Sequence, residues 1–423
     1  MAKEERLLIT GGQRLEGTVR VSGGKNTAAA IIPATILSRT PCVIENLPAI
    51  EDLHVSAQML RHLGAKVDWS PEEGVMQVDA SSINRTDVPL DLSRRMRASS
   101  YYIGALLARF GSAQVPMPGG CDIGRRPIDQ HIKGMRALGA QVDIRRGTVF
   151  ASAEHLTGGD VFLDMATVGG TVNVMLAASR AEGTTTIYNA AKEPHIVDLA
   201  NFLNSMGCRV KGAGTDVIRV RGVQELACRR PYAVIPDQIE TGTLMIAAAA
   251  THGDVTILGC IPTHMEALTA KLLEMGARVE ERDDAIRVRS LGGHRAVAFK
   301  TQVYPGFPTD LQQPMAALLC TATGTSTVVE NIFESRFRFL SEIERMGARV
   351  RVFEQTAVIE GVPQLHAAAV EASDLRAGAA LVIAALMAQG TTEIWGVHFI
   401  DRGYEHLEQK LASLGAQIQR VCD

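Results

Sequence analysis

A three-residue phrase, Leu or Met followed by Gly and then Ala or Cys, recurs six times along the chain. Its glycines lie 68 to 75 residues apart. Each phrase follows apolar residues at helical spacing and precedes a short strand-like stretch, and a glycine after the last helical residue is what a left-handed helix cap requires. Six repeats of roughly 70 residues fill all 423 positions, so the repeat predicts the fold. The six glycines are Gly64, Gly139, Gly207, Gly276, Gly347 and Gly415.

One repeat contains two helices and three or four strands. In the third repeat, residues 170–178 are small and apolar and predict a helix, and the β-branched residues 184–188 predict a strand. Residues 196–206 then carry apolar side chains at helical spacing. The first helix of a repeat is almost entirely apolar, as in Ala247–Ala250, and is therefore expected to be buried. The second helix is amphipathic and is expected to lie outside it.

The length of the chain exceeds what one hydrophobic core usually serves, so two domains are expected. Repeats one to three and four to six are a natural division, joined by the Pro- and Arg-rich residues 228–236. The pattern predicts an α/β protein with three repeats around buried helices in each domain. A regular repeat protein that only binds partners is the alternative at this stage.

Composition disfavours several classes of protein. The net charge of −3 argues against a general polyanion-binding surface, and the longest apolar stretch, residues 377–388, is too short to span a membrane. The first residues lack the apolar core of a signal peptide. Seven scattered cysteines without a Cys-x-x-Cys pair favour a reducing cytosol and argue against structural zinc or a disulfide framework. Motifs for a P-loop or a dinucleotide cofactor are missing.

Three repeats place a cation at the start of the first helix, where Thr or Asp stands in the others. Lys25, Arg97 and Arg376 oppose the helix dipole there, at a cost of some tenths of a kcal/mol. Cations at such positions indicate an anion among them, because free N–H groups and the dipole favour one as well. For any single position the alternative is a solvated Lys or Arg without a role. The occurrence of a cation at three of the six helix starts favours the anion site.

The start of the second helix in repeat two carries a thiol between glycines and guanidiniums. Residues 118–127 contain three glycines, Cys121, Arg125 and Arg126. An unperturbed thiol is mostly protonated at neutral pH and can donate a proton, whereas neighbouring arginines favour the thiolate, and the sequence leaves both forms open. Inert burial is expected for five cysteines among apolar or strand residues: Cys42, Cys208, Cys228, Cys260 and Cys320.

Over essentially the whole chain, these segments resemble the UDP-N-acetylglucosamine 1-carboxyvinyltransferase family of the EPSP synthase superfamily. Eight ordered motifs carry the likeness: residues 22–26, 96–99, 118–127, 189–194, 236–242, 307–310, 374–376 and 401–405. The resemblance implies a two-domain inverted α/β barrel of six repeats with a cleft between the domains. The implied domains are residues 25–235, with a mobile Cys loop, and residues 1–24 plus 236–423.

The resemblance also implies a reaction. The enolpyruvyl group of phosphoenolpyruvate would pass to the 3-hydroxyl of UDP-N-acetylglucosamine with release of phosphate, the first committed step of peptidoglycan synthesis. It implies a cytoplasmic enzyme that uses small-molecule substrates, no metal or organic cofactor, no nucleic acid and no membrane. An enolpyruvyl transferase with another acceptor and a non-catalytic UDP-sugar-binding regulator are the alternatives. The intact set of Lys25, Cys121, Asp310 and Arg402 disfavours the regulator.

Residue roles follow from the family motifs. Cys121 would protonate the methylene carbon of phosphoenolpyruvate as a general acid and could add covalently to the same substrate, and fosfomycin is expected to label it, as in Cys-bearing relatives. Asp310 would accept the proton of the sugar hydroxyl or orient that group. The substrate-binding residues implied for the phosphate and carboxylate are Lys25, Arg126, Arg376 and Arg402. Those implied for the UDP-sugar are Asn26, Arg97, Arg126, Pro127, Ile128, Asp129, Gln130, His131, Thr167, Val168, Gly169 and Ile332.

Structural alternatives remain open at three of these places. Asp310 could be a plain N-cap, Ile332 could belong to the core, and Asp374 could cap its helix while Arg376 binds the ligand. Three further positions depart from the family pattern and suggest a paralogue with altered kinetics, although the reacting groups are intact: Met165, His195 and Gln238.

Overall fold

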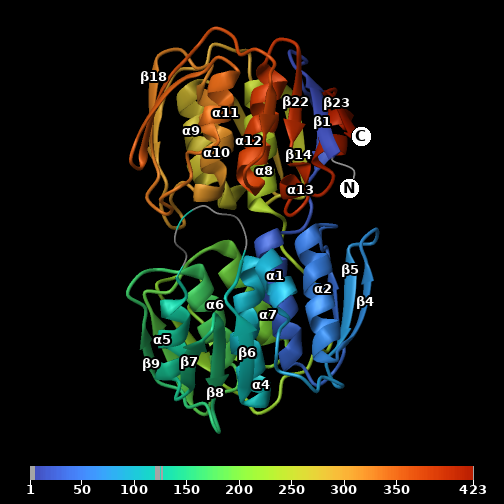
Figure 1. Cartoon of the computed structure of the whole chain (residues 1–423), viewed down its shortest axis with the longest axis vertical. Helices are drawn as coiled ribbons and strands as arrows, with labels where there is room; N and C mark the ends of the chain where they lie inside the picture. Colours follow the sequence, from blue (N-terminus) through green and yellow to red (C-terminus); the bar gives the residue numbers. More distant parts are fainter. Residues whose placement is uncertain (1–4, 120–123, 125–126, 423) are drawn as a thin grey trace. The chain divides into compact units, whose positions relative to one another are not determined.

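The computed structural model describes residues 5–119, 124 and 127–422, which form two compact units. The N-terminal unit comprises residues 23–119 and 127–235, and the C-terminal unit comprises residues 5–22, 124 and 236–422 (Figure 1). We propose that these units are the two domains expected from the sequence, with the first division between residues 22 and 23. The predicted mobile segment around Cys121 lies outside the described residues.

The N-terminal unit contains three sheets and the helices between their strands. The strands are β3 (Cys42–Glu45), β4 (Lys66–Ser70), β5 (Val75–Asp79), β6 (Ser112–Pro116), β7 (Gln141–Arg145), β8 (Thr148–Ser152), β9 (Asp160–Phe162), β10 (Thr184–Tyr188), β11 (Arg209–Lys211), β12 (Val217–Arg221) and β13 (Tyr232–Ala233). The helices are α1 (Lys25–Ala34), η1 (Thr35–Leu37), α2 (Glu51–Leu63), α3 (Leu90–Arg95), η2 (Arg97–Ser100), α4 (Tyr101–Phe110), α5 (Asp129–Ala137), α6 (Val168–Ala178) and α7 (Pro194–Ser205).

The C-terminal unit also contains three sheets. Its strands are β1 (Glu5–Thr10), β2 (Glu16–Arg20), β14 (Asp254–Leu258), β15 (Arg278–Glu281), β16 (Ala285–Arg289), β17 (Ala298–Lys300), β18 (Thr325–Val329), β19 (Arg349–Phe353), β20 (Thr356–Glu360), β21 (Ala369–Glu371), β22 (Thr391–Trp395) and β23 (Gln417–Cys422). Its helices are α8 (Gln238–Ala250), η3 (Pro262–His264), α9 (Glu266–Met275), α10 (Thr309–Leu319), α11 (Leu340–Arg345), α12 (Leu375–Met387), α13 (Val397–Ile400) and α14 (Leu407–Ser413).

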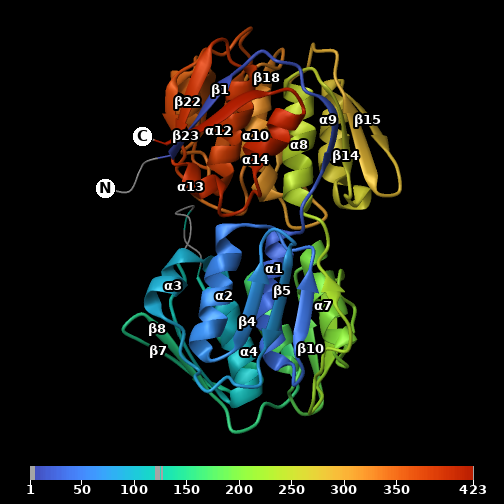
Figure 2. The same cartoon turned by 90° about the vertical axis from the view of Figure 1, so that its right-hand side faces the viewer.

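Five of the six sheets in the described residues share one pattern, with one parallel and two antiparallel strand pairs. In the sheet β11-β12-β10-β9, Ile187 of β10 lies opposite both Val161 of β9 and Ile218 of β12. The first strand of the chain, β1, lies between β22 and β23, with Leu7 opposite Ile394 (Figure 2). Small mixed sheets combined with helices confirm the predicted α/β fold class.

Buried helices form the centre of each unit. In the C-terminal unit α8, α10 and α12 pack against one another, and in the N-terminal unit α4 packs against α1 and α6 (Figure 1). Small residues permit this approach: the Gly104 N–H of α4 donates to Asn173 Oδ1 of α6 at 2.7 Å, and a Cβ at Gly104 would lie 2.5 Å from the Asn173 carbonyl oxygen. The predicted burial of the apolar first helices is confirmed, as in α12, where residues 375–386 are all buried.

The repeat glycines adopt the conformation that the sequence analysis expected of them. All six have φ angles between 90° and 105°. Gly64 and Gly276 follow α2 and α9 directly in the left-handed region, and their N–H groups donate to carbonyls of the last helical turn. A side chain at these positions would be strained. The predicted left-handed helix ends are therefore confirmed.

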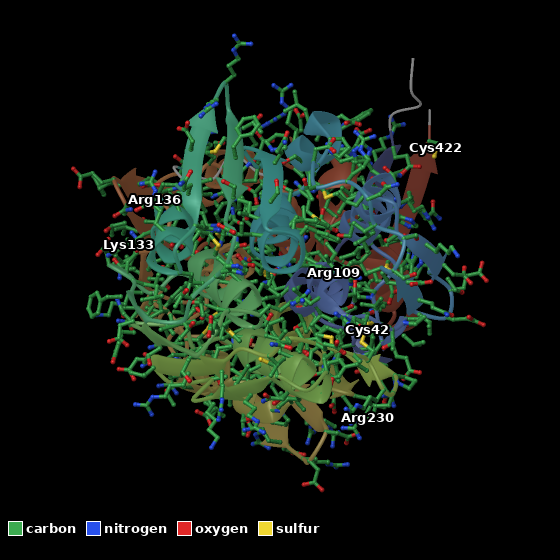
Figure 3. All side chains as sticks on the ribbon, turned by 90° about the horizontal axis from the view of Figure 1, so that it is seen from below. Cys42, Arg109, Lys133, Arg136, Arg230 and Cys422 are labelled. Atoms are coloured by element: carbon green, nitrogen blue, oxygen red, sulfur yellow. A yellow bond between two sulfur atoms is a disulfide. The ribbon has the colours of Figure 1, made fainter. Side chains whose placement is uncertain are left out.

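Two cysteines expected to be buried thiols instead form a disulfide, so that expectation is wrong for them. Cys42, labelled in Figure 3, begins β3. Cys228 precedes β13, and the Cα atoms of the two cysteines are 5.3 Å apart. Their segments are also joined by a hydrogen bond from the Arg39 N–H to the Leu226 carbonyl at 2.8 Å. Because the partners are 186 residues apart, spacing along the chain gave no signal of the pair. The other cysteines expected to be inert are buried and free: Cys208, Cys260 and Cys320.

Loss of this disulfide is expected to lower the free energy of unfolding by about 2–4 kcal/mol, because the cross-link closes a long loop of the unfolded chain. The double variant Cys42→Ala/Cys228→Ala should unfold at lower urea concentration than the oxidised protein, and reduction of the wild type should have the same effect. Cys422→Ser, which removes an exposed free thiol, is the control. Denatured, unreduced protein should show five free thiols among its seven cysteines, and a count of seven would contradict the disulfide.

Candidate functional site

Asp310 lies in the first turn of α10 and is held by two arginines. Its Oδ1 accepts from Nη2 of Arg336 at 2.8 Å, and its Oδ2 accepts from Nη2 of Arg376 at 3.1 Å. Burial alone would raise the pKa of Asp310, but the charges of Arg376 and Arg336 and their hydrogen bonds hold it well below its usual value. The N-cap of α10 is Pro308, so the interpretation of Asp310 as a plain N-cap is wrong.

Arg376 lies at the start of α12 and is almost completely buried. Asp374 is the N-cap of this helix, and its Oδ1 accepts from the backbone N–H groups of Arg376 and Ala377, each at 3.0 Å. The guanidinium carbon of Arg376 lies 5.1 Å from the ring centroid of Tyr404. Within the described residues, Nε and Nη1 of Arg376 and Nε of Arg336 are buried and meet no hydrogen-bond acceptor. Such donors are costly to leave unsatisfied, so they favour an anionic or polar ligand.

Like Arg336 and Arg376, the side chain of Glu330 is buried near Asp310. Glu330 follows β18 and is fully buried. Its Oε1 accepts from the Thr301 hydroxyl at 2.9 Å and from the backbone N–H groups of Ile332 and Phe333 at 2.8 and 3.1 Å. Its Oε2 accepts from the Thr309 hydroxyl at 2.9 Å. We call Asp310, Arg336, Arg376, Thr309 and Glu330 the Asp310 cluster.

Arg336 and Glu330 were not predicted from the sequence. The only signal in the sequence was that one charged residue precedes Ile332 and another follows it, shortly after the β-branched residues 325–329. Ile332 itself is half-buried, which leaves it outside the fully buried core. Arg402, also predicted for substrate binding, is half-buried in the turn between α13 and α14.

In the N-terminal unit, Lys25 is the first residue of α1 and its Nζ donates to Asp52 Oδ2 of α2. This acidic partner explains how a cation is tolerated at a helix start. Asn26 follows Lys25 and is half-buried. The expected pattern of a cation in the first turn is observed, and we propose that Lys25 is one of the groups that meets a substrate anion.

A second group of predicted residues gathers around His131 of α5. Asn173 Nδ2 donates to His131 Nδ1 at 2.7 Å, and a Cβ at Gly169 would lie 2.6 Å from His131 Nε2. Burial and the positive charge of Arg97 together lower the pKa of His131 to about 4. The imidazole is therefore neutral at pH 7, with Nδ1 as an acceptor and Nε2 as a donor. Arg97, His131 and Gly169, which are distant in sequence, are thus brought together.

The remaining predicted residues of the N-terminal unit flank this group. Gln130 is buried, and its amide donates to Asp164 at 3.0 Å. Thr167 occupies the N-cap position of α6 without a side-chain capping bond. Ile128 is buried, Pro127 and Asp129 are exposed, and Val168 is half-buried. Cys121 and Arg126 lie outside the described residues.

Residues 5–119, 124 and 127–422 contain no group of three His, Cys, Asp or Glu side chains that could hold a metal ion. In the same residues, no helix is both long and apolar enough to cross a membrane. A cavity of about 500 Å³ in the N-terminal unit is lined by Arg39, Arg109 and Arg180 but contains none of the predicted site residues. Arg109 and Arg180 donate there to backbone carbonyls, which gives them a structural role.

Comparison with known proteins shows which family this chain belongs to. Residues 9–411 match the family profile described as EPSP synthase (3-phosphoshikimate 1-carboxyvinyltransferase). The chain belongs to the EPSP synthase family. Within it, the chain is 54% identical to UDP-N-acetylglucosamine 1-carboxyvinyltransferase 3 of Caldanaerobacter subterraneus subsp. tengcongensis, with 99% of each chain covered. It is 55% identical to UDP-N-acetylglucosamine 1-carboxyvinyltransferase of Clostridium botulinum, and the match covers 98% of this chain and 100% of the relative.

Two solved structures have the same fold as this chain. The enolpyruvyl transferase NikO from Streptomyces tendae superposes with a TM-score of 0.89 at 28% identity, and both chains are covered completely. EPSP synthase from Acinetobacter baumannii superposes with a TM-score of 0.76 at 18% identity, over 99% of this chain and 100% of that one, and shows the shared fold. The predictions of the family and of an enzyme are confirmed.

Three departures from the family pattern lie outside the Asp310 cluster and away from Lys25 in sequence. Met165 is 62% exposed after β9. His195 is buried in the first turn of α7, and Gln238 is the first residue of α8. The positions of these three residues leave the hydrogen bonds of Asp310 intact.

Proposed function

We propose that the protein transfers the enolpyruvyl group of phosphoenolpyruvate to the 3-hydroxyl of UDP-N-acetylglucosamine and releases phosphate. The main support is that relatives named UDP-N-acetylglucosamine 1-carboxyvinyltransferase match nearly the whole chain at 51–55% identity. The Asp310 cluster supports it, because buried guanidinium N–H groups beside an ionised carboxylate suit a reaction between an anion and a hydroxyl. Small-molecule substrates and a cytoplasmic location, where the precursors of peptidoglycan are made, belong to the same proposal.

Asp310 is best suited to orient the acceptor hydroxyl. A carboxylate held ionised by two guanidiniums is a weak base in the ground state, because a general base works best with a pKa near the working pH. It is nevertheless a strong hydrogen-bond acceptor with a fixed direction. As the hydroxyl attacks and becomes acidic, the same carboxylate can receive its proton.

The arginines and Lys25 would neutralise the phosphoenolpyruvate anion. Two nitrogens of Arg376, Nε and Nη1, meet no acceptor in the described chain, and a guanidinium binds carboxylate or phosphate through parallel hydrogen bonds. Fixed positive charges also stabilise the negative charge that moves onto phosphate as it leaves. Lys25, Arg126 and Arg402 share this role in our proposal, in line with the family motifs.

The UDP-sugar would be recognised by the residues around His131. A neutral imidazole donates one N–H and costs less to desolvate than an imidazolium. Arg97 supplies a positive charge beside it for the diphosphate. The other residues of this proposed site are Asn26, Pro127, Ile128, Asp129, Gln130, Thr167, Val168, Gly169 and Ile332.

Phosphate release from phosphoenolpyruvate in the presence of UDP-N-acetylglucosamine tests the proposal. We expect one phosphate per enolpyruvyl ether formed, and no release when either substrate is omitted. Mass spectrometry of the UDP-sugar should show the added enolpyruvyl group. No release with this acceptor, together with release with another one, would favour the alternative of a transferase with a different acceptor.

A further inference from the structure

Two threonines on either side of one loop make matching hydrogen bonds to Glu330. Thr301 follows β17 and Thr309 begins α10, and residues 302–308 connect them. Each hydroxyl donates to one oxygen of the Glu330 carboxylate at 2.9 Å. Each hydroxyl oxygen also accepts one bond: Thr301 from the Asn331 backbone N–H at 2.9 Å, and Thr309 from Nη1 of Arg336 at 2.8 Å.

The direction of these hydrogen bonds is fixed by Glu330. An ionised carboxylate can only accept, so the Thr309 proton must point toward it. The lone pairs of Thr309 are then free for the Nη1–H of Arg336. The other terminal nitrogen of Arg336, Nη2, donates to Asp310. A continuous chain of hydrogen bonds therefore runs from Glu330 through Thr309 and Arg336 to Asp310.

Glu330 is also expensive to bury. An ionised carboxylate out of water costs several kcal/mol unless each of its oxygens is satisfied. Here four donors satisfy it: the Thr301 hydroxyl after β17, the Thr309 hydroxyl at the start of α10, and two backbone N–H groups of the loop after β18. An apolar side chain would fill the same position at lower cost, which argues for a role beyond packing.

Resting on the proposed function, we infer that Glu330 is a positioning residue that acts through Thr309 and Arg336 to hold the Asp310 carboxylate in its reactive orientation. It touches no substrate. The charged groups that face Asp310 are Arg336 from the loop after β18 and Arg376 from α12. Loss of the Thr309 anchor leaves Arg336 free to turn away, so that Asp310 loses one of its two partners.

Glu330→Gln tests the direction of the hydrogen bonds. Oε1 accepts two backbone N–H groups, so the new amide nitrogen must take the place of Oε2 and donate to Thr309. The Thr309 proton then loses its acceptor. Thr309→Val removes the hydroxyl at nearly constant shape, Thr309→Ser retains it, and Glu344→Gln, at an exposed acid of α11, is the matched control.

We expect Glu330→Gln and Thr309→Val each to lower kcat about tenfold, with a smaller change in KM for both substrates. The acid limb of the pH profile should move to higher pH in both, because Asp310 is less strongly held ionised. Thr309→Ser and Glu344→Gln should stay within about threefold of the wild type. The double variant Glu330→Gln/Thr309→Val should be no slower than Thr309→Val alone, because the chain is already broken.

A purely structural role would lower the melting temperature without moving the acid limb, and that result would overturn the inference. So would additive losses in the double variant. A carbon-13 NMR titration of the Asp310 carboxyl, assigned by its absence in Asp310→Asn, gives a readout that needs no turnover. If the wild type releases no phosphate, the proposed function fails, and an unchanged Asp310 titration in Glu330→Gln and Thr309→Val rejects the positioning role separately.

Discussion

Replacement of Asp310 by Asn is expected to lower kcat by at least about a hundredfold. The amide keeps the shape of the side chain but removes the negative charge that faces Arg336 and Arg376. It can neither receive the hydroxyl proton nor hold both guanidiniums, since its nitrogen is a donor like theirs. KM for phosphoenolpyruvate should change less than kcat, because the arginines that would bind this anion remain.

Asp254→Asn is the matched control for this variant. Asp254 begins β14, accepts two hydrogen bonds of 2.8 Å from Arg287 and is 23% exposed, compared with 24% for Asp310. It is thus an arginine-paired carboxylate of similar exposure away from the cluster. Its loss should leave kcat unchanged. Equal activity of Asp310→Asn and the wild type, measured by phosphate release, would remove Asp310 from the proposed mechanism.

The stability of the Asp310 variant should depend on pH. The pKa of Asp310 is depressed in the folded protein, so its ion pairs stabilise the fold above the ordinary Asp value of 3.8 and lose this effect as the pH falls below it. Asp310→Asn should therefore unfold more easily than the wild type at pH 7. The difference in unfolding free energy should narrow below about pH 4. Urea titrations at pH 7 and at pH 3 would measure both differences.

Local rules explain why much of the fold could be predicted. A glycine cap depends on a few neighbouring residues, so Gly64 and Gly276 could be placed without any knowledge of packing. The same holds for Asp237, an ordinary N-cap whose Oδ1 accepts from the Ile239 and Glu240 N–H groups. The apolar first helices were equally clear, because a helix without a polar face has nowhere to lie but the core.

Features that depend on tertiary packing were missed. Arg336 and Glu330 contact Asp310 and Thr309 only because the loop after β18 packs against the start of α10. No local sequence pattern predicts that these two segments are in contact. The disulfide between Cys42 and Cys228 depends in the same way on the pairing of β13 with β3. Asp310 was predicted from a family motif, but its two arginine partners and hence its depressed pKa came from the structure.

Cys121→Ser is expected to lose most turnover, about a hundredfold or more, while the protein folds normally. Serine has nearly the shape of cysteine, but its hydroxyl is far less acidic than a thiol and is a poorer proton donor to the methylene carbon of phosphoenolpyruvate. It is also a weaker nucleophile, so any covalent adduct with this substrate should be lost. Cys422→Ser, at an exposed free cysteine, should keep the wild-type rate.

An electrophilic epoxide such as fosfomycin separates the reactivity of Cys121 from its effect on folding. Only the thiolate attacks an epoxide rapidly, and the neighbouring Arg125 and Arg126 favour the thiolate as well as an anionic reagent. Buried Cys208, Cys260 and Cys320 should not react, since burial raises their pKa values to about 11, 11 and 12. In Cys422→Ser, which lacks the exposed free thiol, mass spectrometry should find the label on Cys121 alone, with loss of activity in proportion to labelling. A label elsewhere, or an unchanged rate in Cys121→Ser, would show that another group supplies the proton, and the site would then have to be rebuilt around the Asp310 cluster.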